Sequence, residues 1–380
     1  MKKVLVINPG SASTKIAYYE DKEEILNTNV YHEPEELEKF PTIADQYDYR
    51  LTFIKDYLDK KNIELTDIDA VVGRGGSLPP VDAGGYLVND EMTDWLVNKT
   101  DVHHASNLGA LLARGFKEFS HDECIAMIYD PITVDQFHDL SRISGLKGVN
   151  RRSIGHMLNM RAIAMKTAED TGKIYEESNL IVAHLGSGSS ISAHQNGRMI
   201  DLSIDDEGPF SVERTGSLCL KEFIPFCYQM TEKEVIEWTR KKGGMISYLG
   251  TNSGIEVENR IDQGDDEARL VFEAMAYQVS KGIGELATVL CGRVDNIVIT
   301  GGLAYSDRLV DWIKERVSFI APVSCIPGEF EMEALRNGAL RVLAGEEEAK
   351  EFCINFINLV RVRFTIQRVV SCNYINFIKV

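Results

Sequence analysis

Residues 4–17, VLVINPGSASTKIA, join an apolar strand to a second strand that begins near Thr14. The turn between them consists mainly of glycine and serine. Such small residues let consecutive backbone N–H groups approach an oxyanion closely, and the serine hydroxyls add further donors. The turn therefore suits phosphate, although a single Gly/Ser turn is also typical of an ordinary tight hairpin.

A second stretch of the same kind occupies residues 180–194, LIVAHLGSGSSISAH. It again has an apolar run, a glycine and serine turn, and an alternating strand. Aligning Gly10 with Gly186 puts Asn8 opposite His184. Because the hairpin recurs, we expect two similar halves that face each other across a cleft and hold one polyphosphate between them.

Length and composition restrict the class of protein. A chain of 380 residues suggests two or three domains, and we expect two. Its 44% hydrophobic and 26% charged residues are typical of a soluble globular protein. The formal net charge of −17 argues against nucleic acid or an anionic membrane as partner. Anion binding would then need local positive charge, which makes arginines in glycine-rich loops informative.

The cellular location is expected to be the cytoplasm. The first apolar run is too short for a secretory signal, and no run approaches the length of a membrane span. The 7 cysteines are scattered and form no C-x-x-C pair, so they are interpreted as reduced thiols.

The pattern of elements predicts two α/β domains, each with a mixed sheet. Strands are expected at 22–30, 70–72, 125–129, 199–202, 296–300 and 323–326, and helices at 43–58, 107–119, 267–290, 306–316 and 331–344. The pattern restarts after residues 145–150, where Ser153 is expected to cap a helix that runs to about residue 169. We place the first domain at 1–150, joined by the helix within 331–352, and the second, nucleotide-binding domain at 151–330.

The tail at 353–380 does not follow this logic. It contains basic residues but no acidic one, and it shows no capping or turn pattern. We interpret it as a non-native end, with an additional strand or interface arm as the alternative.

Several common sites are excluded. The chain has no P-loop string, and Ile191 stands where a Rossmann fingerprint needs its third glycine. His103 and His104 are adjacent and accompany no zinc signature, so a structural or hydrogen-bonding role is favoured.

Three ordered motifs resemble those of the acetate and butyrate kinases. They are NPGSASTK at 8–15, HLGSGSSISA at 184–193 and VITGGLAY at 298–305, which resemble two phosphate motifs and an adenosine motif. This family belongs to the superfamily of actin, sugar kinases and chaperone ATPases. The resemblance covers residues 1–352 and implies two ribonuclease H-like domains that flank a central cleft.

Two further segments resemble the butyrate kinase branch, GRGGSLPPVDAGGY at 73–86 and RRSIGH at 151–156. Acetate kinases carry FHGTSH where this chain has RRSIGH. Its first histidine, a phosphoryl contact, falls on Arg152, so only its second histidine is carried over, onto His156. We hypothesise that Arg152 supplies positive charge instead.

The resemblance implies a reversible reaction, ATP plus butyrate giving ADP plus butyryl phosphate, with Mg²⁺ as cofactor and a homodimer or higher homo-oligomer as assembly. A carboxylic acid is already ionised at neutral pH, so its activation needs no general base. Charge on the transferring phosphoryl group must instead be aligned and neutralised. Acetate and branched-chain carboxylates are alternative substrates.

The site residues that the resemblance implies fall into four groups. Catalysis is assigned to Arg74, Asp130, Arg214 and His184, although Asp130-Pro131 is also a common turn. Nucleotide binding is assigned to Asn8, Gly10, Ser11, Ser13, Lys15, Gly186, Ser187, Gly188, Ser189, Gly301 and Gly302. Substrate binding is assigned to Arg74, His104 and His156, and Mg²⁺ to Asn8 and Glu331, with Glu333 as an alternative.

A function of another class is a non-catalytic nucleotide switch, because actin-like and chaperone relatives share the ATP hairpins. Arg74, Asp130 and Arg214 together distinguish the two, since a switch has no need of them.

Overall fold

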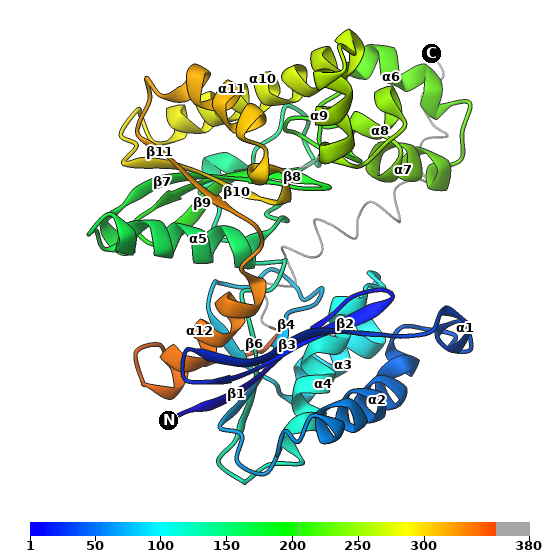
Figure 1. Ribbon diagram of the computed structural model, residues 1–380, viewed down its shortest axis with the longest axis vertical. Coiled ribbons are helices and arrows are strands. Elements are labelled where there is room, and N and C mark those ends of the chain that lie inside the picture. The colour runs from blue at the N-terminus through cyan, green and yellow to red at the C-terminus, as the bar shows by residue number, and fades with distance from the viewer. Residues whose placement is uncertain (205, 355–380) are drawn as a thin grey trace. The chain divides into compact units, whose positions relative to one another are not determined.

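The computed structural model describes residues 1–204 and 206–354 (Figure 1). The chain forms two compact units. The first contains Met1–Asp135, Ser144–Arg152 and the described residues from Glu331 onward, and the second contains Gln136–Ile143 and Ser153–Phe330. Of the predicted atypical tail, 353–380, all but Cys353 and Ile354 lies outside the described residues.

The first unit is built on a sheet with the strand order β12-β5-β6-β4-β1-β2-β3. Strands β1 (Lys3–Pro9), β2 (Ser13–Glu20) and β3 (Glu23–Tyr31) are antiparallel, whereas β4 (Ala70–Arg74) and β6 (Ile125–Tyr129) continue the sheet in parallel. Strands β5 (Gly85–Leu87) and β12 (Lys350–Glu351) extend it beyond β6.

Helices cover both faces of this sheet. The helices of the unit are α1 (Pro34–Leu37), α2 (Tyr47–Lys60), α3 (Asp90–Asp94), α4 (Leu108–Lys117) and α12 (Glu331–Leu343). Leu5 and Ile7 of β1 form a core with Ile54 of α2 and Leu112 of α4. Helix α12 packs against β1, β4 and β6 from the other side (Figure 1).

The second unit repeats the same arrangement of five strands. Its sheet has the order β11-β10-β7-β8-β9. Strands β7 (Asn179–Leu185), β8 (Ser189–Gln195) and β9 (Arg198–Ser203) are antiparallel, and β10 (Asn296–Gly301) and β11 (Val323–Pro327) are parallel to β7. This order matches β6-β4-β1-β2-β3 of the first sheet. The predicted pair of α/β domains with mixed sheets is confirmed.

The helices of the second unit are α5 (Met157–Asp170), α6 (Leu220–Cys227), α7 (Glu232–Lys241), α8 (Gly244–Leu249), α9 (Gly254–Asp262), α10 (Asp266–Val289) and α11 (Asp307–Val317). The core is centred on α10, where Val271, Met275, Val279 and Ile283 are buried at helical spacing. Helices α6 to α9 had no counterpart in the sequence prediction.

One predicted boundary is wrong. Helix α5 begins at Met157 and its N-cap is His156, so Ser153 does not cap it. Ser153 is buried four residues before the helix, in a segment without helical structure. Asn196 and Gly197, between β8 and β9, have φ values of 52° and 71°, the left-handed values that a type I′ turn requires.

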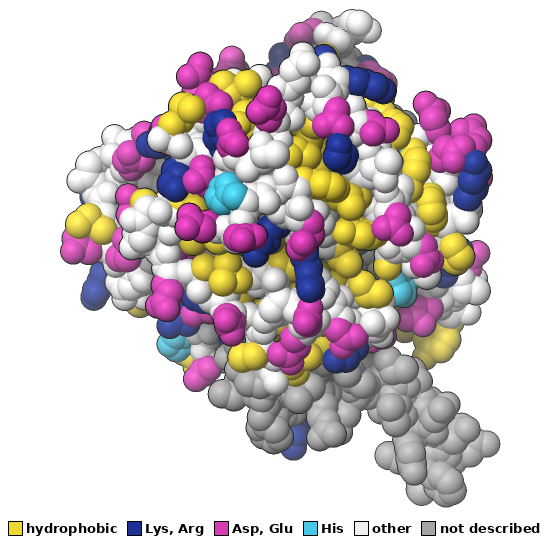
Figure 2. Space-filling model, turned by 90° about the horizontal axis from the view of Figure 1, so that it is seen from below, with side chains coloured by type: hydrophobic (Ala, Val, Ile, Leu, Met, Phe, Trp, Pro, Cys, Tyr) yellow, Lys and Arg dark blue, Asp and Glu magenta, His cyan; other side chains and the backbone are white. Residues whose placement is uncertain are grey.

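The surface agrees with the composition of the chain. Acidic side chains are scattered over the face shown in Figure 2, and basic side chains lie singly among them. Within the described part of the chain, no helix is both long and apolar enough to cross a membrane.

Candidate functional site

The first turn lies between β1 and β2, where the N–H of Gly10 donates to the carbonyl of Ser13 across 2.7 Å. Asn8 and Lys15 face each other in the register of the two strands. Ser11 is exposed at the tip, and Ser13 and Lys15 are half-buried. The predicted phosphate residues of the first hairpin therefore surround one accessible turn.

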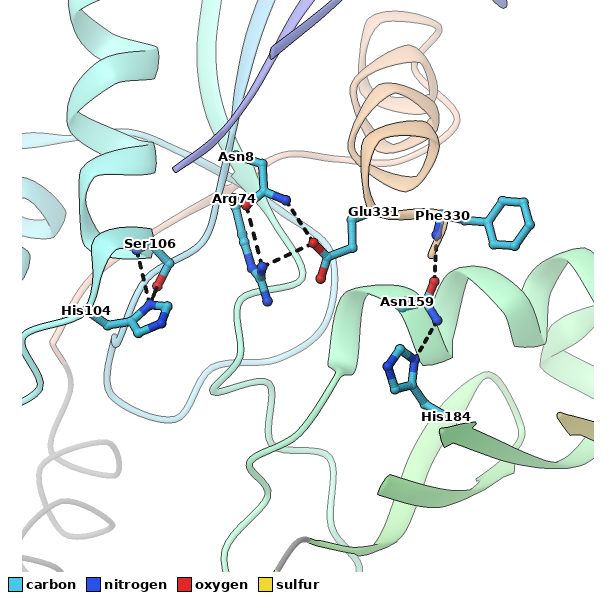
Figure 3. A network of polar contacts seen from close by, with 8 residues as sticks. All are labelled: Asn8, Arg74, His104, Ser106, Asn159, His184, Phe330 and Glu331. Carbon is cyan, nitrogen blue, oxygen red and sulfur yellow. Dashed lines mark hydrogen bonds and ion pairs between the residues drawn. The ribbon is translucent and has the colours of Figure 1, made fainter. Parts of the chain in front are cut away.

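Arg74, Asn8 and Glu331 meet at the ends of β4, β1 and the start of α12 (Figure 3). The guanidinium of Arg74 lies 3.1 Å from Oε2 of Glu331, and Asn8 donates from Nδ2 to the same oxygen across 2.8 Å. The side chains of Arg74 and Glu331 are 25% and 13% exposed. The structure thus brings together a predicted substrate arginine and both predicted metal residues.

Glu333, the alternative metal residue, does not take part in this contact. It lies near Tyr19, where its charge adds to burial in raising the pKa of the phenol. The geometry therefore favours Glu331 over Glu333 as the neighbour of Asn8.

Asp130 follows β6 in an unusual backbone conformation. Its φ is 39°, a left-handed value that few residues other than glycine, asparagine and aspartate adopt. The side chain is 4% exposed, and its Oδ1 accepts a hydrogen bond from the N–H of Gly84 at 2.7 Å. The carboxylate is held against the loop that follows Arg74.

His104 precedes α4, and its environment favours the neutral ring. Loss of water around the ring, to which the positive charge of Arg74 adds, lowers the pKa of His104. Its Nδ1 accepts from the N–H of Ser106 at 3.2 Å (Figure 3). A backbone N–H can only donate, so the single proton of the neutral ring resides on Nε2.

His184 lies near the end of β7, 2% exposed, with one ring nitrogen fixed by Asn159 of α5. Asn159 Nδ2 is 2.9 Å from His184 Nδ1, and the N–H of Phe330 donates to Asn159 Oδ1 at 2.9 Å (Figure 3). The Phe330 N–H orients the amide so that its NH₂ group faces the ring. His184 Nδ1 is therefore an acceptor, and its proton resides on Nε2.

The same histidine lies against the second turn. A Cβ added to Gly186 would be 3.5 Å from His184 Nε2, so this nitrogen faces the turn residues. His156 stacks on the ring of His184, with centroids 3.9 Å apart, and its Nδ1 lies 3.1 Å from the hydroxyl of Ser190. Two of the predicted histidines are thus packed together beside the second hairpin.

Arg214 also lies against the second turn. A Cβ on Gly188 would be 2.7 Å from Arg214 Nε, a separation too short for real atoms. Ser211 fixes the loop, because its hydroxyl donates to the carbonyl of Ser187 at 2.6 Å and accepts from the N–H of Arg214 at 3.3 Å. The absence of a side chain at Gly188 is what admits the arginine.

Gly301 ends β10 and Gly302 follows it, and the two glycines differ in their surroundings. Gly301 has a φ of 93°, and a Cβ there would lie 2.3 Å from the carbonyl oxygen of Leu185. Gly302 has open space where a Cβ would be. Gly301 therefore serves the close approach of β10 to β7, and Gly302 is the one of the pair that can face a ligand.

Asn8 and Glu331 are compatible with Mg²⁺. This ion prefers one or two carboxylates, with phosphates and water completing its shell. Glu331 supplies one carboxylate beside the amide of Asn8, although Arg74 pairs with the same carboxylate. Among the described residues, no group of three or more acidic, cysteine or histidine side chains gathers as a denser metal site.

Three residues that contact the predicted site residues were absent from the sequence prediction. They are Asn159, Ser211 and Arg50, the last of which reaches the first turn from α2. Arg50 carries a recognisable signal, because it lies three residues after Tyr47 and four before Ile54, on the apolar stripe of its helix. A charged residue on such a stripe indicates a specific buried partner.

Comparisons with known proteins identify the family of the chain. The model of the acetokinase family matches residues 122–317. Butyrate kinase 2 of Clostridium acetobutylicum is 44% identical over 354 residues, which are 92% of this chain and 99% of that protein.

Two solved structures share the fold. Acetate kinase from Porphyromonas gingivalis has a TM-score of 0.75 at 18% identity and covers 90% of this chain and 100% of its own. A propionate kinase from Francisella tularensis has a TM-score of 0.71 at 17% identity, covering 89% and 99%. With the relative at 44% identity and the family model, the predicted resemblance is confirmed: this chain belongs to the acetokinase family.

Proposed function

We propose that this protein is a short-chain fatty acid kinase that transfers the γ-phosphoryl group of ATP to the carboxylate of butyrate. The products are ADP and butyryl phosphate. Family membership and the 44% identity to a butyrate kinase support this reaction. We further propose that it works in the cytoplasm as a homodimer and takes Mg²⁺ with its nucleotide.

One observation carries the proposal. In the second unit, Nε2 of His184 and the guanidinium of Arg214 both lie against the turn Gly186–Gly188, where added Cβ atoms would meet them at 3.5 and 2.7 Å. Backbone N–H groups, a neutral histidine donor and an arginine fork around one turn are suited to phosphoryl oxygens. A structural turn would not require two polar side chains packed onto its glycines.

The chemical step follows from this arrangement. A carboxylate oxygen of butyrate attacks the γ-phosphorus, and the bond from that phosphorus to the β–γ bridging oxygen breaks, leaving ADP. No proton has to move, because the nucleophile is already an anion. Catalysis is therefore a matter of alignment and of neutralising charge on the transferring group.

The residues take separate roles in that step. Arg74 binds the carboxylate of the substrate, with the Nε2 proton of His104 as a further donor. Arg214 and His184 bind the transferring phosphoryl oxygens. Asn8 and Glu331 would hold Mg²⁺, which neutralises phosphate charge when bound. Asp130 orients the loop after Arg74 through Gly84.

The test is ATP-dependent acyl phosphate formation by the purified protein, with the product trapped as its hydroxamate and acetate, propionate, butyrate, isobutyrate and valerate compared. Each buried CH₂ contributes about 0.8 kcal/mol, so two additional methylenes in a matching pocket favour butyrate over acetate by roughly 15-fold in kcat/KM. A higher kcat/KM for acetate would reject the choice of butyrate. ADP formation that does not depend on any carboxylate would reject the kinase and favour a nucleotide switch.

Two substitutions connect the activity to the site. Arg74→Ala and Arg214→Ala are each expected to lower kcat/KM by about 100-fold or more, as loss of an arginine from a phosphoryl transfer site does. The matched controls are Arg114→Ala, which breaks an exposed ion pair with Asp90, and Arg198→Ala at the exposed start of β9. Equal effects in the site and control variants would contradict the assignment.

A further inference from the structure

Arg50 is a buried arginine beneath the first turn. It lies on α2 and is 1% exposed. Its NH1 donates to the carbonyl of Gly10 at 2.8 Å, and its NH2 donates to the carbonyl of Ser11 at 2.9 Å. Further contacts join it to Oε1 of Gln46 at 2.8 Å and to the hydroxyl of Thr14 at 3.2 Å.

All of these partners are neutral. Within the described part of the chain, no carboxylate forms an ion pair with Arg50, and burial alone lowers its pKa, to about 10. The side chain therefore remains a cation at neutral pH. A buried charge without a counter-charge is costly, and an anion bound at the adjacent turn would supply the missing opposite charge.

The carbonyls that Arg50 holds determine where the adjacent N–H groups point. In a trans peptide the C=O and N–H bonds point in opposite directions. Because Arg50 binds the carbonyls of Gly10 and Ser11, the N–H groups of Ser11 and Ala12 point away from the guanidinium. Both residues are exposed, and neither N–H has a hydrogen-bond partner among the described residues.

We propose that Arg50 is a positioning residue for nucleotide binding: it presents the N–H groups of Ser11 and Ala12 to a phosphate anion and supplies the positive charge behind them. The inference rests on the proposed function only in taking ATP as the source of that phosphate. Arg50 touches no phosphate itself, because the turn lies between.

This role differs from that of an arginine with a structural ion pair. Arg341 provides the comparison within the same unit, since it pairs with Glu347 at 3.1 Å and contacts the hydroxyl of Tyr129. Glu347 compensates the charge of Arg341 without any ligand. Arg341 is distant from the first turn in the sequence, and neither of these contacts involves that turn. Removing Arg341 is expected to affect stability but not the affinity for nucleotide.

The experiment measures binding of ATP and of inorganic pyrophosphate in the absence of any carboxylate, by calorimetry and by the shift in Tm. Arg50→Met is expected to weaken ATP binding by at least tenfold and to abolish most of the Tm shift that pyrophosphate causes. Arg341→Gln should leave both within twofold of the wild-type value. In turnover assays, Arg50→Met should raise KM for ATP and leave KM for the carboxylate within twofold.

Arg50→Lys separates charge from geometry, because lysine keeps the cation but lacks the planar fork that holds two carbonyls together. Arg50→Lys should retain a salt-sensitive part of the ATP affinity and lose the rest. If Arg50→Met does not fold, the ATP affinity of Arg50→Lys alone tests the proposal. The proposal would be overturned if Arg50→Lys binds ATP as tightly as the wild type and Arg50→Met either does the same or does not fold. Because these measurements need no carboxylate, a failure of butyrate turnover leaves them valid.

Discussion

Asn159 donates from Nδ2 to Nδ1 of His184 across 2.9 Å, and this bond determines which nitrogen of the buried imidazole carries the proton. The N–H of Phe330 fixes the orientation of the amide by donating to its oxygen. A histidine that faces the second turn is thereby kept as a donor through Nε2.

Replacing Asn159 with aspartate should reverse this arrangement. The carboxylate still accepts from Phe330 but can no longer donate to the ring, so the proton of His184 moves to Nδ1. We expect kcat to fall by about tenfold or more, the equivalent of roughly 1.4 kcal/mol, because Nε2 ceases to be a donor. The ¹⁵N shifts of the imidazole report the tautomer directly, and an unchanged tautomer with lower kcat would contradict the explanation.

Glu331 and Glu333 offer a matched pair on one helical turn. Glu331→Gln removes the carboxylate next to Asn8 and should raise the Mg²⁺ concentration for half-maximal activity by about tenfold or more, since the ion loses its charged ligand. Glu333→Gln should leave that concentration nearly unchanged, because Glu333 lies near Tyr19 instead. The measurement is a Mg²⁺ titration at fixed ATP, and the opposite order of effects would move the metal assignment to Glu333.

Gly188 tests the packing of Arg214 without removing the arginine. In Gly188→Ala the new methyl group would lie 2.7 Å from Arg214 Nε, so the guanidinium must move. We expect kcat to fall by about tenfold or more, which corresponds to an activation free energy higher by about 1.4 kcal/mol. The Tm should change little. Gly284→Ala on α10, where a Cβ meets nothing within 4 Å, should retain full activity. Full activity in Gly188→Ala would show that the position of Arg214 is unimportant.

His32 should make the stability of the protein depend on pH. Burial, with the charge of Arg50 adding to it, lowers the pKa of His32 to about 4. Between pH 6.5 and 4 the unfolded chain takes up a proton that the folded chain does not, so the free energy of unfolding decreases as pH falls. The decrease is at most about 3.5 kcal/mol, from roughly 1.4 kcal/mol per pKa unit.

The measurement is urea unfolding at pH 7.0, 5.5 and 4.5 for the wild type and for His32→Gln. The variant should show a flatter dependence on pH because it no longer titrates at this position. His194, whose pKa is lowered by burial to about 3, retains its own contribution in both proteins. Identical slopes for the two proteins would contradict the role given to His32.

Sequence alone predicted most of the strands, because their apolar runs are continuous and end in glycine or proline. Residues 4–7 and 296–300 are examples, and both lie in interior strands of their sheets. The start of α5 could not be predicted in this way. Ser153 has the right chemistry for an N-cap, but His156 stacks on His184 and contacts Ser190, and the helix begins only after these contacts.

The predicted site residues came from motifs, which name the groups near a ligand but not the groups that hold them. Asn159 lies 25 residues from His184, and Arg50 lies 40 residues from Gly10. Such contacts depend on how α5 and α2 pack on their sheets, which local sequence does not encode. Helices α6 to α9 were missed for a related reason, since α6 and α7 bury no residue and so show little of a core-facing pattern.

The shared strand order of the two sheets has a consequence for ancestry. If both units descend from one duplicated gene, the ancestral chain contributed the five strands and the small-residue turn, and each copy then acquired its own support for that turn. In the first copy a helix supplied Arg50, and in the second a loop supplied Ser211 and Arg214. The strands and the turn would then be inherited from the ancestor, whereas the charged and polar side chains around the turn would have diverged between the two units.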